Sequence, residues 1–405
     1  MAVKLNSPTE LLPIKGIRLA STAAQIRYRN RNDLLLMSLV EGSTTAAVFT
    51  QNKYCAAPVI IAREHLQKTQ PRALLINAGN ANAGTGKEGL DNVVSSCEAV
   101  ATSLGLDVEQ ILPFSTGVIG EQLPMDKVVN GVSEVADKLS EDNWLEAAAT
   151  IMTTDTVAKG VSEQFEIDGE KITITGIVKG SGMICPNMAT LLSYVATDAN
   201  IPSDILQVLL ERATEASFNR ITVDSDTSTN DALVLIATGQ SNVDFESLES
   251  ETIAQFYSSL KKVLVELATA VVRDGEGATK FVEVEIIGGK TKKDCATIAY
   301  SIAHSPLVKT ALFASDPNWG RILAAIGKAD VNDLNIETID ISINGQSLIK
   351  AGEPAPSYNE EIGQQIFQQD EITINVNLNL GKESYNVWTS DLSHEYVSIN
   401  ADYRS

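Results

Sequence analysis

The chain has 405 residues, 44% of them hydrophobic, so it can bury a sizeable core and is long enough for two lobes. Its formal net charge of −21 argues against nucleic acid as a partner, because phosphate backbones are held mainly by Lys and Arg. Apolar runs such as Leu34–Met37 are far shorter than a membrane span, and the first ten residues lack a signal-peptide pattern. We therefore expect a folded cytoplasmic protein that binds neither membrane nor nucleic acid.

The cysteine and histidine patterns predict neither a disulfide framework nor a metal site. The cysteines are widely scattered without CxxC spacing, which favours a reducing compartment. The histidines are far apart in sequence and lack HxxxH spacing. These residues are Cys55, Cys97, Cys185 and Cys295, and His65, His304 and His394.

The first notable segment, residues 77–87, reads NAGNANAGTGK and is rich in glycine. A phosphate-binding Walker motif needs Gly five residues before the Gly-Lys pair and Ser or Thr after it. Ala81 and Glu88 occupy those two places. We interpret the segment as structural turns rather than a nucleotide site.

Further along, short strands alternate with amphipathic helices. Residues 166–175 predict a hairpin, with Asp168-Gly169 supplying the turn. Helical spacing of apolar residues predicts a helix over 205–213 and a clearer one over 256–271. The alternating run 281–286 predicts a strand, and Asn344-Gly345 predicts another hairpin turn.

This mixture indicates an α/β or α+β fold with stacked β-sheets covered by helices. We expect a catalytic core over residues 1–280 and a smaller C-terminal α/β lobe over 281–405. Between the two predicted helices, residues 223–231 contain three aspartates but lack the Gly and distal Glu of an EF-hand, so a polar hydrogen-bonded loop is the better interpretation.

Residues 179–199, KGSGMICPNMATLLSYVATDA, carry the most chemical information. Thr190 follows the small Ala189 in a turn-rich setting, and a hydroxyl beside its own peptide carbonyl can attack it. Scission would give Thr190 a free α-amine, which titrates at about 7.7 to 8.0 and can serve as the base for its hydroxyl. The alternative is an ordinary β-turn and buried strand, for which these residue types are equally suited.

A family resemblance favours the self-cleavage hypothesis. The run GIVKGSGMICPNMATLLSYVATDA closely resembles the self-cleavage and active-site segment of the ornithine acetyltransferase family, also called glutamate N-acetyltransferase. Other segments resemble the same family in the same order over essentially the whole chain. They are ALLINAGNANAGTG, LPFSTGVIG, IMTTDT, FNRITVDSDTSTNDA, VVRDGEGATKF, SDPNWGRI and YVSINADYRS.

The resemblance implies an N-terminal-nucleophile enzyme cut between Ala189 and Thr190. The α chain would be residues 1–189 and the β chain would begin at residue 190, with an α2β2 assembly expected. The oxyanion hole falls on Thr116 and Gly117, since a hydroxyl and a backbone N–H can stabilise a tetrahedral intermediate. In isolation, this Ser-Thr-Gly segment would be interpreted as a plain turn.

Substrate contacts implied by the same resemblance include a cation and a carboxylate. A Lys can pair with the carboxylate of an N-acetylated amino acid, and a Glu can meet an ornithine ammonium group. Thr154 remains an alternative to its neighbour Thr153, and the role of the last residue requires the C-terminal tail to fold back. The contacts are Thr153, Lys179, Thr190, Glu276, Asn400 and Ser405.

The activity that the resemblance implies is ping-pong acetyl transfer from N²-acetyl-L-ornithine to L-glutamate, through an acetyl-Thr190 intermediate and without a metal or organic cofactor. Some family members also accept acetyl-CoA, and no motif in this chain separates the two types. Two alternatives stay open: a self-processed aminopeptidase or amidase of similar fold, and an uncleaved binding protein without chemistry.

Overall fold

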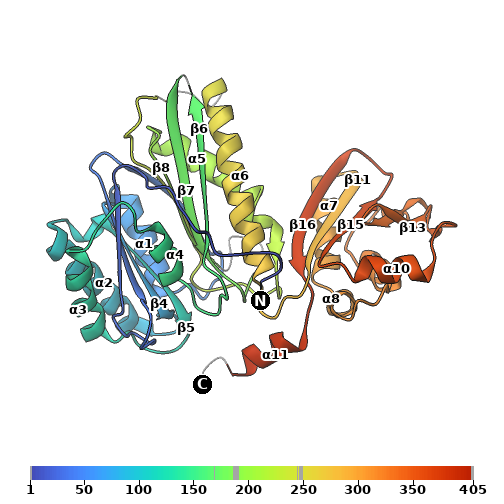
Figure 1. Ribbon diagram of the computed structural model, residues 1–405, viewed down its shortest axis with the longest axis horizontal. Coiled ribbons are helices and arrows are strands. Elements are labelled where there is room, and N and C mark those ends of the chain that lie inside the picture. Colours follow the sequence, from blue (N-terminus) through green and yellow to red (C-terminus); the bar gives the residue numbers. More distant parts are fainter. Residues whose placement is uncertain (1, 168, 186–190, 244, 246–249, 403–405) are drawn as a thin grey trace. The chain divides into compact units, whose positions relative to one another are not determined.

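The computed structural model describes residues 2–167, 169–185, 191–243, 245 and 250–402, and the chain folds as two compact units (Figure 1). The large unit comprises Asn6–Asn219 and Asp226–Val271. The small unit comprises Met1–Leu5, Arg220–Ser225 and Val272–Ser405. The N-terminal segment belongs to the small unit because the amide of Val3 donates to the carbonyl of Arg273 at 2.8 Å. These boundaries do not coincide with the expected lobes, which divide the chain at residue 280.

The large unit contains two β-sheets. The first has four strands in the order β1-β2-β4-β5, and only the β4–β5 pair is parallel. The second has five strands in the order β3-β10-β8-β7-β6, and only the β10–β8 pair is parallel. The first-sheet strands are β1 (Ile17–Thr22), β2 (Leu34–Leu39), β4 (Ala73–Asn80) and β5 (Ile111–Val118); the second-sheet strands are β3 (Thr44–Phe49), β10 (Ala232–Ala237), β8 (Leu192–Thr197), β7 (Glu170–Lys179) and β6 (Lys159–Ile167).

The two sheets stack face to face over a shared apolar core. Side chains alternate along each strand, so Leu35 and Met37 of β2 face this inner core while Leu34 faces the helices on the other side. Across the core, the rings of Phe114 on β5 and Tyr194 on β8 form an edge-to-face contact with centroids 5.3 Å apart. The packing is therefore that of a sandwich with one shared interior.

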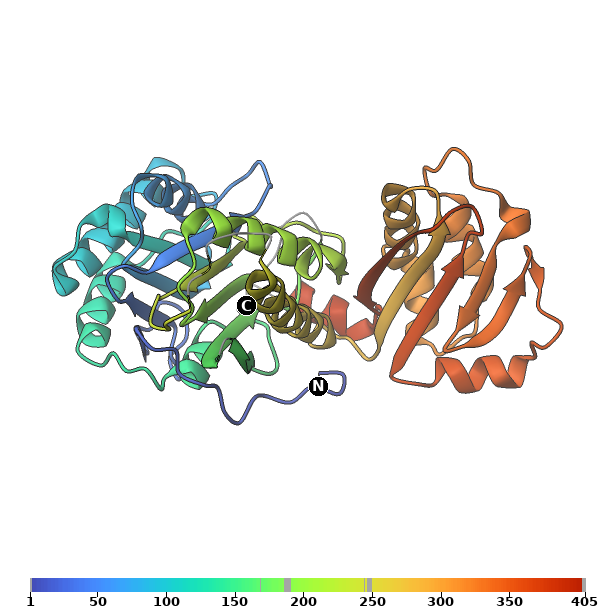
Figure 2. The same cartoon turned by 90° about the horizontal axis from the view of Figure 1, so that it is seen from above.

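Helices cover both outer faces of this sandwich, as the cyan and yellow helices in Figure 2 illustrate. A Cβ on Gly176 of β7 would lie only 2.8 Å from Leu267, so the glycine allows close approach of the long helix α6. The helices over the first sheet are α1 (Ala57–Lys68), α2 (Gly86–Leu104) and α3 (Met125–Ala136); those over the second are α5 (Ser203–Glu215) and α6 (Glu251–Arg273), and α4 (Trp144–Thr150) joins the inner core.

The small unit has one seven-stranded sheet in the order β14-β13-β12-β15-β11-β16-β9. Apolar side chains alternate along its strands and pack against α7 to α10, and the intervening positions are largely polar. The strands are β9 (Ile221–Thr222), β11 (Phe281–Gly289), β12 (Asp340–Ile343), β13 (Gln346–Lys350), β14 (Glu353–Pro354), β15 (Glu371–Asn377) and β16 (Glu383–Ser390); the helices are α7 (Lys292–Ala303), α8 (Pro306–Phe313), α9 (Trp319–Gly327), α10 (Glu360–Phe367) and α11 (His394–Ala401).

The predicted fold class is confirmed: stacked sheets with covering helices form the large unit, and a smaller α/β unit contains the C-terminal part of the chain. The β6–β7 hairpin, the β12–β13 hairpin and helices α5 and α6 all occur where the sequence predicts them. In the part of the chain that the structure describes, we find no helix with the length and apolar character needed to cross a membrane.

Candidate active site

Near its end, strand β5 bends at an irregularity in its pairing with β4 that involves Thr116 and Gly117, the predicted oxyanion pair. Gly117 has φ +135°, and a Cβ built on it would lie 2.2 Å from the carbonyl carbon of Gly79 on β4. Glycine alone accommodates both this conformation and this close approach. Thr116 is 9% exposed, and its hydroxyl forms no hydrogen bond with the described residues. At this bend the Thr116 hydroxyl and the Gly117 backbone amide belong to consecutive residues.

The side chain of Asn230 fixes the backbone just before this bend. Its Nδ2 donates to the carbonyl of Ser115 at 2.9 Å and to the carbonyl of Ala81 at 2.6 Å. Asn230 is 6% exposed and lies two residues before β10, so its amide connects the two sheets of the sandwich. Buried carbonyls need such donors, and here one side chain satisfies two of them.

The glycine-rich segment predicted as structural turns forms the end of β4 and the turn into α2. Some of its polar side chains bind within the segment: Asn77 Nδ2 donates to the carbonyl of Asn80 at 2.8 Å, and Thr85 Oγ1 donates to Asn82 Oδ1 at 2.7 Å. The amide of Asn82 also donates to Asn80 Oδ1 at 2.8 Å. This internal bonding agrees with a structural role.

The start of β8 lies between two ionisable side chains. Lys179, the last residue of β7, pairs in register with Leu192, the first residue of β8. On the other side, Asp231 lies directly before Ala232 of β10, which also pairs with Leu192. The predicted nucleophile and cleavage site, Thr190 and Ala189, lie outside the described residues, as does Ser405.

Asp231 is a buried carboxyl group, 2% exposed, with one oxygen that has no hydrogen-bond partner in the described chain. Burial raises its pKa well above the ordinary aspartate value, although hydrogen bonds from the Ser228 side chain and the Leu191 amide, and the charge of Lys179, act in the opposite direction. Asp231 thus holds the backbone of the first described residue before β8.

Asp155, in the predicted substrate segment, organises two loops. Its side chain and that of Lys159 are completely buried and form an ion pair of 2.6 Å. The carboxylate also accepts the amides of Gly180 at 2.7 Å and Thr153 at 2.9 Å. Burial alone would raise the pKa of Asp155, but Lys159 and then Lys179 outweigh it and hold that pKa far below the usual range.

Thr153 and Thr154, the two alternatives for the predicted substrate contact, differ in the hydrogen bonds of their hydroxyls. The hydroxyl of Thr154 lies 2.6 Å from that of Ser181, so the two are hydrogen-bonded to each other. The hydroxyl of Thr153 forms no hydrogen bond with any residue that the structure describes. Of the two, only the Thr153 hydroxyl therefore retains its full hydrogen-bonding capacity for a ligand.

Two further predicted contacts, Glu276 and Asn400, meet within the small unit. Asn400 lies on α11, and its Nδ2 donates to Glu276 Oε2 at 2.8 Å. Glu276 is 8% exposed and follows α6 by three residues. The start of α11 is capped by Ser393, which accepts the amide of Tyr396 at 3.4 Å and donates to the carbonyl of Gly277 at 2.6 Å.

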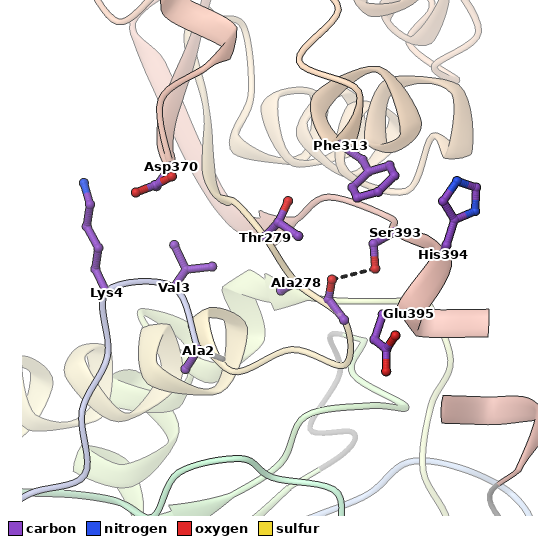
Figure 3. Close-up of a pocket in the computed structure, with 11 residues that line it drawn as sticks. Ala2, Val3, Lys4, Ala278, Thr279, Phe313, Asp370, Ser393, His394 and Glu395 are labelled. Atoms are coloured by element: carbon purple, nitrogen blue, oxygen red, sulfur yellow. Dashed lines mark hydrogen bonds between the residues drawn. The ribbon is translucent and has the colours of Figure 1, made fainter. Parts of the chain in front are cut away.

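A pocket of about 550 Å³ opens beside this cap, within the small unit (Figure 3). Figure 3 shows Lys4 and Asp370 on one side of it, and His394 and Glu395 from α11 on the other. Neither Glu276 nor Asn400 lines the pocket, although Gly277 does. It therefore adjoins the segment that carries Glu276 without containing the predicted contact.

Among the described residues, no group of three or more His, Cys, Asp or Glu side chains is placed to hold a metal ion. The polar groups described above are hydroxyls, backbone amides, the lysines Lys159 and Lys179, and the carboxyl groups of Asp155, Asp231 and Glu276, and the donors among them are the hydroxyls, amides and lysines. Such donors suit the chemistry of an oxyanion and of carboxylate ligands.

Comparison with known proteins decides the family. The ArgJ family model matches residues 18–405. The chain belongs to the ArgJ family. This confirms the predicted resemblance, and the chain is accordingly an enzyme of that family, as predicted. The "Arginine biosynthesis bifunctional protein ArgJ" of Pseudomonas syringae pv. tomato is 51% identical over 409 residues, covering 100% of each chain.

Two further proteins are similar to this chain. The protein of the same name from Psychrobacter arcticus is 50% identical over 399 residues, covering 98% of each chain. A crystal structure of ornithine acetyltransferase complexed with ornithine from Mycobacterium tuberculosis is 34% identical, covers 43% of this chain and 93% of that one, and has a TM-score of 0.38.

The sequence alone did not predict the roles of several buried polar residues. Asp155 and Lys159 flank a loop, and Asn230 with Asp231 was interpreted only as part of a polar loop. The four-residue spacing of Asp155 and Lys159 was the available signal, but this spacing is commonest in exposed helical pairs. Their importance comes from partners far away in the sequence.

Proposed function

We propose that the chain transfers the acetyl group of N²-acetyl-L-ornithine to L-glutamate, through an acetyl-Thr190 intermediate formed after self-cleavage at Ala189–Thr190. Membership of the ArgJ family over nearly the whole chain supports this proposal. The observation that carries it is the bend at Thr116 and Gly117, whose donors lie at the end of a strand tied by Asn230 to the start of β10.

Self-cleavage prepares the nucleophile. The Thr190 hydroxyl attacks the carbonyl of Ala189, and hydrolysis of the resulting ester leaves Thr190 with a free α-amine. Support comes from the segment that follows, because Asp231 hydrogen-bonds the Leu191 amide and so holds the backbone next to Thr190. The α-amine then accepts the hydroxyl proton in each turnover.

Transfer proceeds in two balanced halves. Thr190 Oγ attacks the acetyl carbon of acetylornithine, the amide C–N bond breaks, and ornithine leaves with the proton. The α-amine of glutamate then attacks the acetyl ester, and Thr190 Oγ leaves and regains a proton. In both halves the Thr116 hydroxyl and the Gly117 amide stabilise the oxyanion, and one such donor is worth roughly 3 to 4 kcal/mol.

Substrate recognition divides between charge and hydrogen bonding. Lys179 pairs with the substrate α-carboxylate, and the Thr153 hydroxyl, which has no hydrogen bond to a described residue, binds beside it. Glu276 meets the ornithine ammonium group, and its bond with Asn400 orients the carboxylate. Ser405 completes the contacts from the C-terminal tail. Glutamate uses the same site with an oppositely charged side chain, so that subsite must admit water.

Family membership also supports a second acetyl donor, a location in the cell and an assembly for this enzyme. The curated relatives are named bifunctional, which supports acetyl-CoA as a second acetyl donor for glutamate here. We place the enzyme in the cytoplasm, as two α and two β chains from the cleaved precursor. Neither membrane nor nucleic acid is a partner.

The test replaces Thr190. Thr190→Ala should give one full-length band on a denaturing gel and no acetyl transfer, because both cleavage and acylation need the hydroxyl. Thr190→Ser should retain part of both activities. A purified Thr190→Ala protein that still migrates as two fragments would contradict the assignment.

The competing activities are separated by leaving out glutamate. With acetylornithine alone, the cleaved wild-type enzyme should nearly stop after one turnover, since the acetyl group has no acceptor. Continued release of ornithine and acetate would instead identify a hydrolase of the aminopeptidase or amidase type. A wild-type protein that stays uncleaved and inert would identify a binding protein.

A further inference from the structure

Two segments predicted to bind substrate are joined by one buried carboxylate. Residues 152–156 contain Thr153, and residues 179–181 contain Lys179. The Asp155 carboxylate accepts the Thr153 amide through Oδ2 at 2.9 Å and the Gly180 amide through Oδ1 at 2.7 Å. A single side chain thus fixes the backbone of one predicted contact and of the residue next to the other.

The Asp155 carboxylate is itself held by an ion pair with Lys159. Lys159 Nζ donates to Asp155 Oδ1 at 2.6 Å, and neither side chain has any exposed area. An ion pair that is completely buried has few alternative rotamers, and its partner satisfies the charge that burial would otherwise penalise. A second link joins the same segments, since the hydroxyls of Thr154 and Ser181 lie 2.6 Å apart.

The charges of this group suit an anionic ligand. Lys159 and Lys179 carry two positive charges against the single negative charge of Asp155, and Lys179 lies close enough to lower the pKa of that carboxyl. The three side chains therefore sum to +1 in a protein whose formal net charge is −21. Of these charges, that of Lys179 is the one proposed to meet the carboxylate of an amino-acid substrate, whereas the completely buried Lys159 balances Asp155.

From these contacts we propose that Asp155 is a positioning residue that sets the separation of Thr153 and Lys179 and so determines affinity for the substrate carboxylate. The inference rests on the proposed function, in which those two residues touch the substrate. Asp155 acts through them and has no contact with the reacting atoms. Its loss should therefore weaken binding in the ground state and the transition state alike, which raises KM more than it lowers kcat.

The experiment uses a pair of variants with opposite expected behaviour. Lys159→Met keeps the Asp155 carboxylate and its bonds to Thr153 and Gly180 but removes the buried counter-charge, so thermal stability should fall while KM for acetylornithine stays within about twofold. In the double variant Asp155→Asn with Lys159→Met, no charge is left buried, so stability should largely recover. Its KM should nevertheless rise about tenfold or more, because an amide oxygen cannot replace both carboxylate oxygens.

A matched control comes from an exposed pair in the same unit. Glu163 and Lys262 form an ion pair of 2.8 Å, and Glu163→Gln should change neither KM nor stability measurably. A merely structural role for Asp155 predicts that KM follows stability across the variants. That outcome, or an unchanged KM in the double variant, would overturn the inference.

Failure of the proposed function gives a different result. If the wild-type enzyme and Glu163→Gln both fail to transfer acetyl groups, the activity is wrong, and hydrogen exchange then tests the positioning directly. The amides of Thr153 and Gly180 should exchange slowly in wild type and in Lys159→Met, and markedly faster in the double variant. Equal exchange in all three would overturn the positioning role independently of any reaction.

Discussion

Lys159 of the large unit and Lys309 of the small unit are both buried, and their amines are compensated differently. In the large unit, Lys159 donates to the Asp155 carboxylate at 2.6 Å. In the small unit, Lys309 is 4% exposed and donates to Thr389 Oγ1 at 3.0 Å and to the Ser390 carbonyl, both neutral acceptors. A carboxylate favours the charged form of a buried amine more strongly than neutral oxygens do. The large unit therefore pairs its buried amine with a carboxylate, whereas the small unit holds one with neutral acceptors, and burial lowers the pKa of that amine.

The same contrast extends to the predicted substrate contacts. In the large unit, the bend at Thr116 is held by buried side chains, including the 6% exposed Asn230. In the small unit, Asn400 lies on α11, a two-turn helix with no buried residue. Helices this short depend on tertiary contacts and caps for their stability. We infer that the predicted oxyanion pair of the large unit is held rigidly, and that the predicted contact on α11 of the small unit depends on a few hydrogen bonds.

The largest expected effect is the pH dependence of Lys309. Burial lowers its pKa from 10.5 to about 8, although Asp391 and Asp224 oppose this shift. Between pH 8 and 10.5 the unfolded chain binds more protons than the folded one, so the free energy of unfolding should rise with pH by on the order of 3 kcal/mol.

Urea unfolding of the full chain from pH 7.5 to 10.5 measures this contribution as the difference between wild type and Lys309→Met. The difference is needed because other lysines and tyrosines titrate in the same range. Parallel pH profiles for the two proteins would show that Lys309 keeps its ordinary protonation on folding, and the contrast with Lys159 would then disappear.

A smaller effect is expected from breaking the network of the large unit. Asn230→Ala removes the donor for the carbonyls of Ser115 and Ala81, which leaves buried acceptors unsatisfied and should cost about 2 kcal/mol. Asn52→Ala is the control, because Asn52 donates to the Thr227 carbonyl at 3.1 Å in an exposed setting and should cost less than about 0.5 kcal/mol. Equal losses of unfolding free energy in the two variants, measured by urea unfolding, would mean that the buried Asn230 amide stabilises the chain no more than the exposed Asn52 amide does.

The fold was predictable where its signals are local. The Asn344-Gly345 turn and the apolar stripe that became α6 are encoded by neighbouring residues, and both predictions are confirmed. Strand order was not predictable, because β9 is two residues long and pairs with β16 more than 160 positions later. No periodicity can be read from two residues, so tertiary pairing alone defines that strand.

The candidate site was predictable only through family resemblance. Thr116 and Gly117 resemble any turn, and what distinguishes them is the approach of Gly79, a residue of another strand. Asp155 has the spacing of a surface ion pair with Lys159, and its role appears only with the Gly180 amide 25 positions away. Residues whose partners are distant in sequence carry no local pattern from which their role could be inferred.

The smallest expected effect concerns the cap of α11. Ser393→Ala removes both the bond from the Tyr396 amide and the bond to the Gly277 carbonyl, and losing an N-cap costs about 1 kcal/mol. Amide exchange over residues 394–401 should accelerate about fivefold, which corresponds to that free energy. Ser398→Ala is the control on the same helix, since Ser398 bonds only to the His394 carbonyl at 3.3 Å and is exposed. If both variants exchange at the wild-type rate, α11 is held by more than its cap, and the small unit is as firmly built at this position as the large unit is at Thr116.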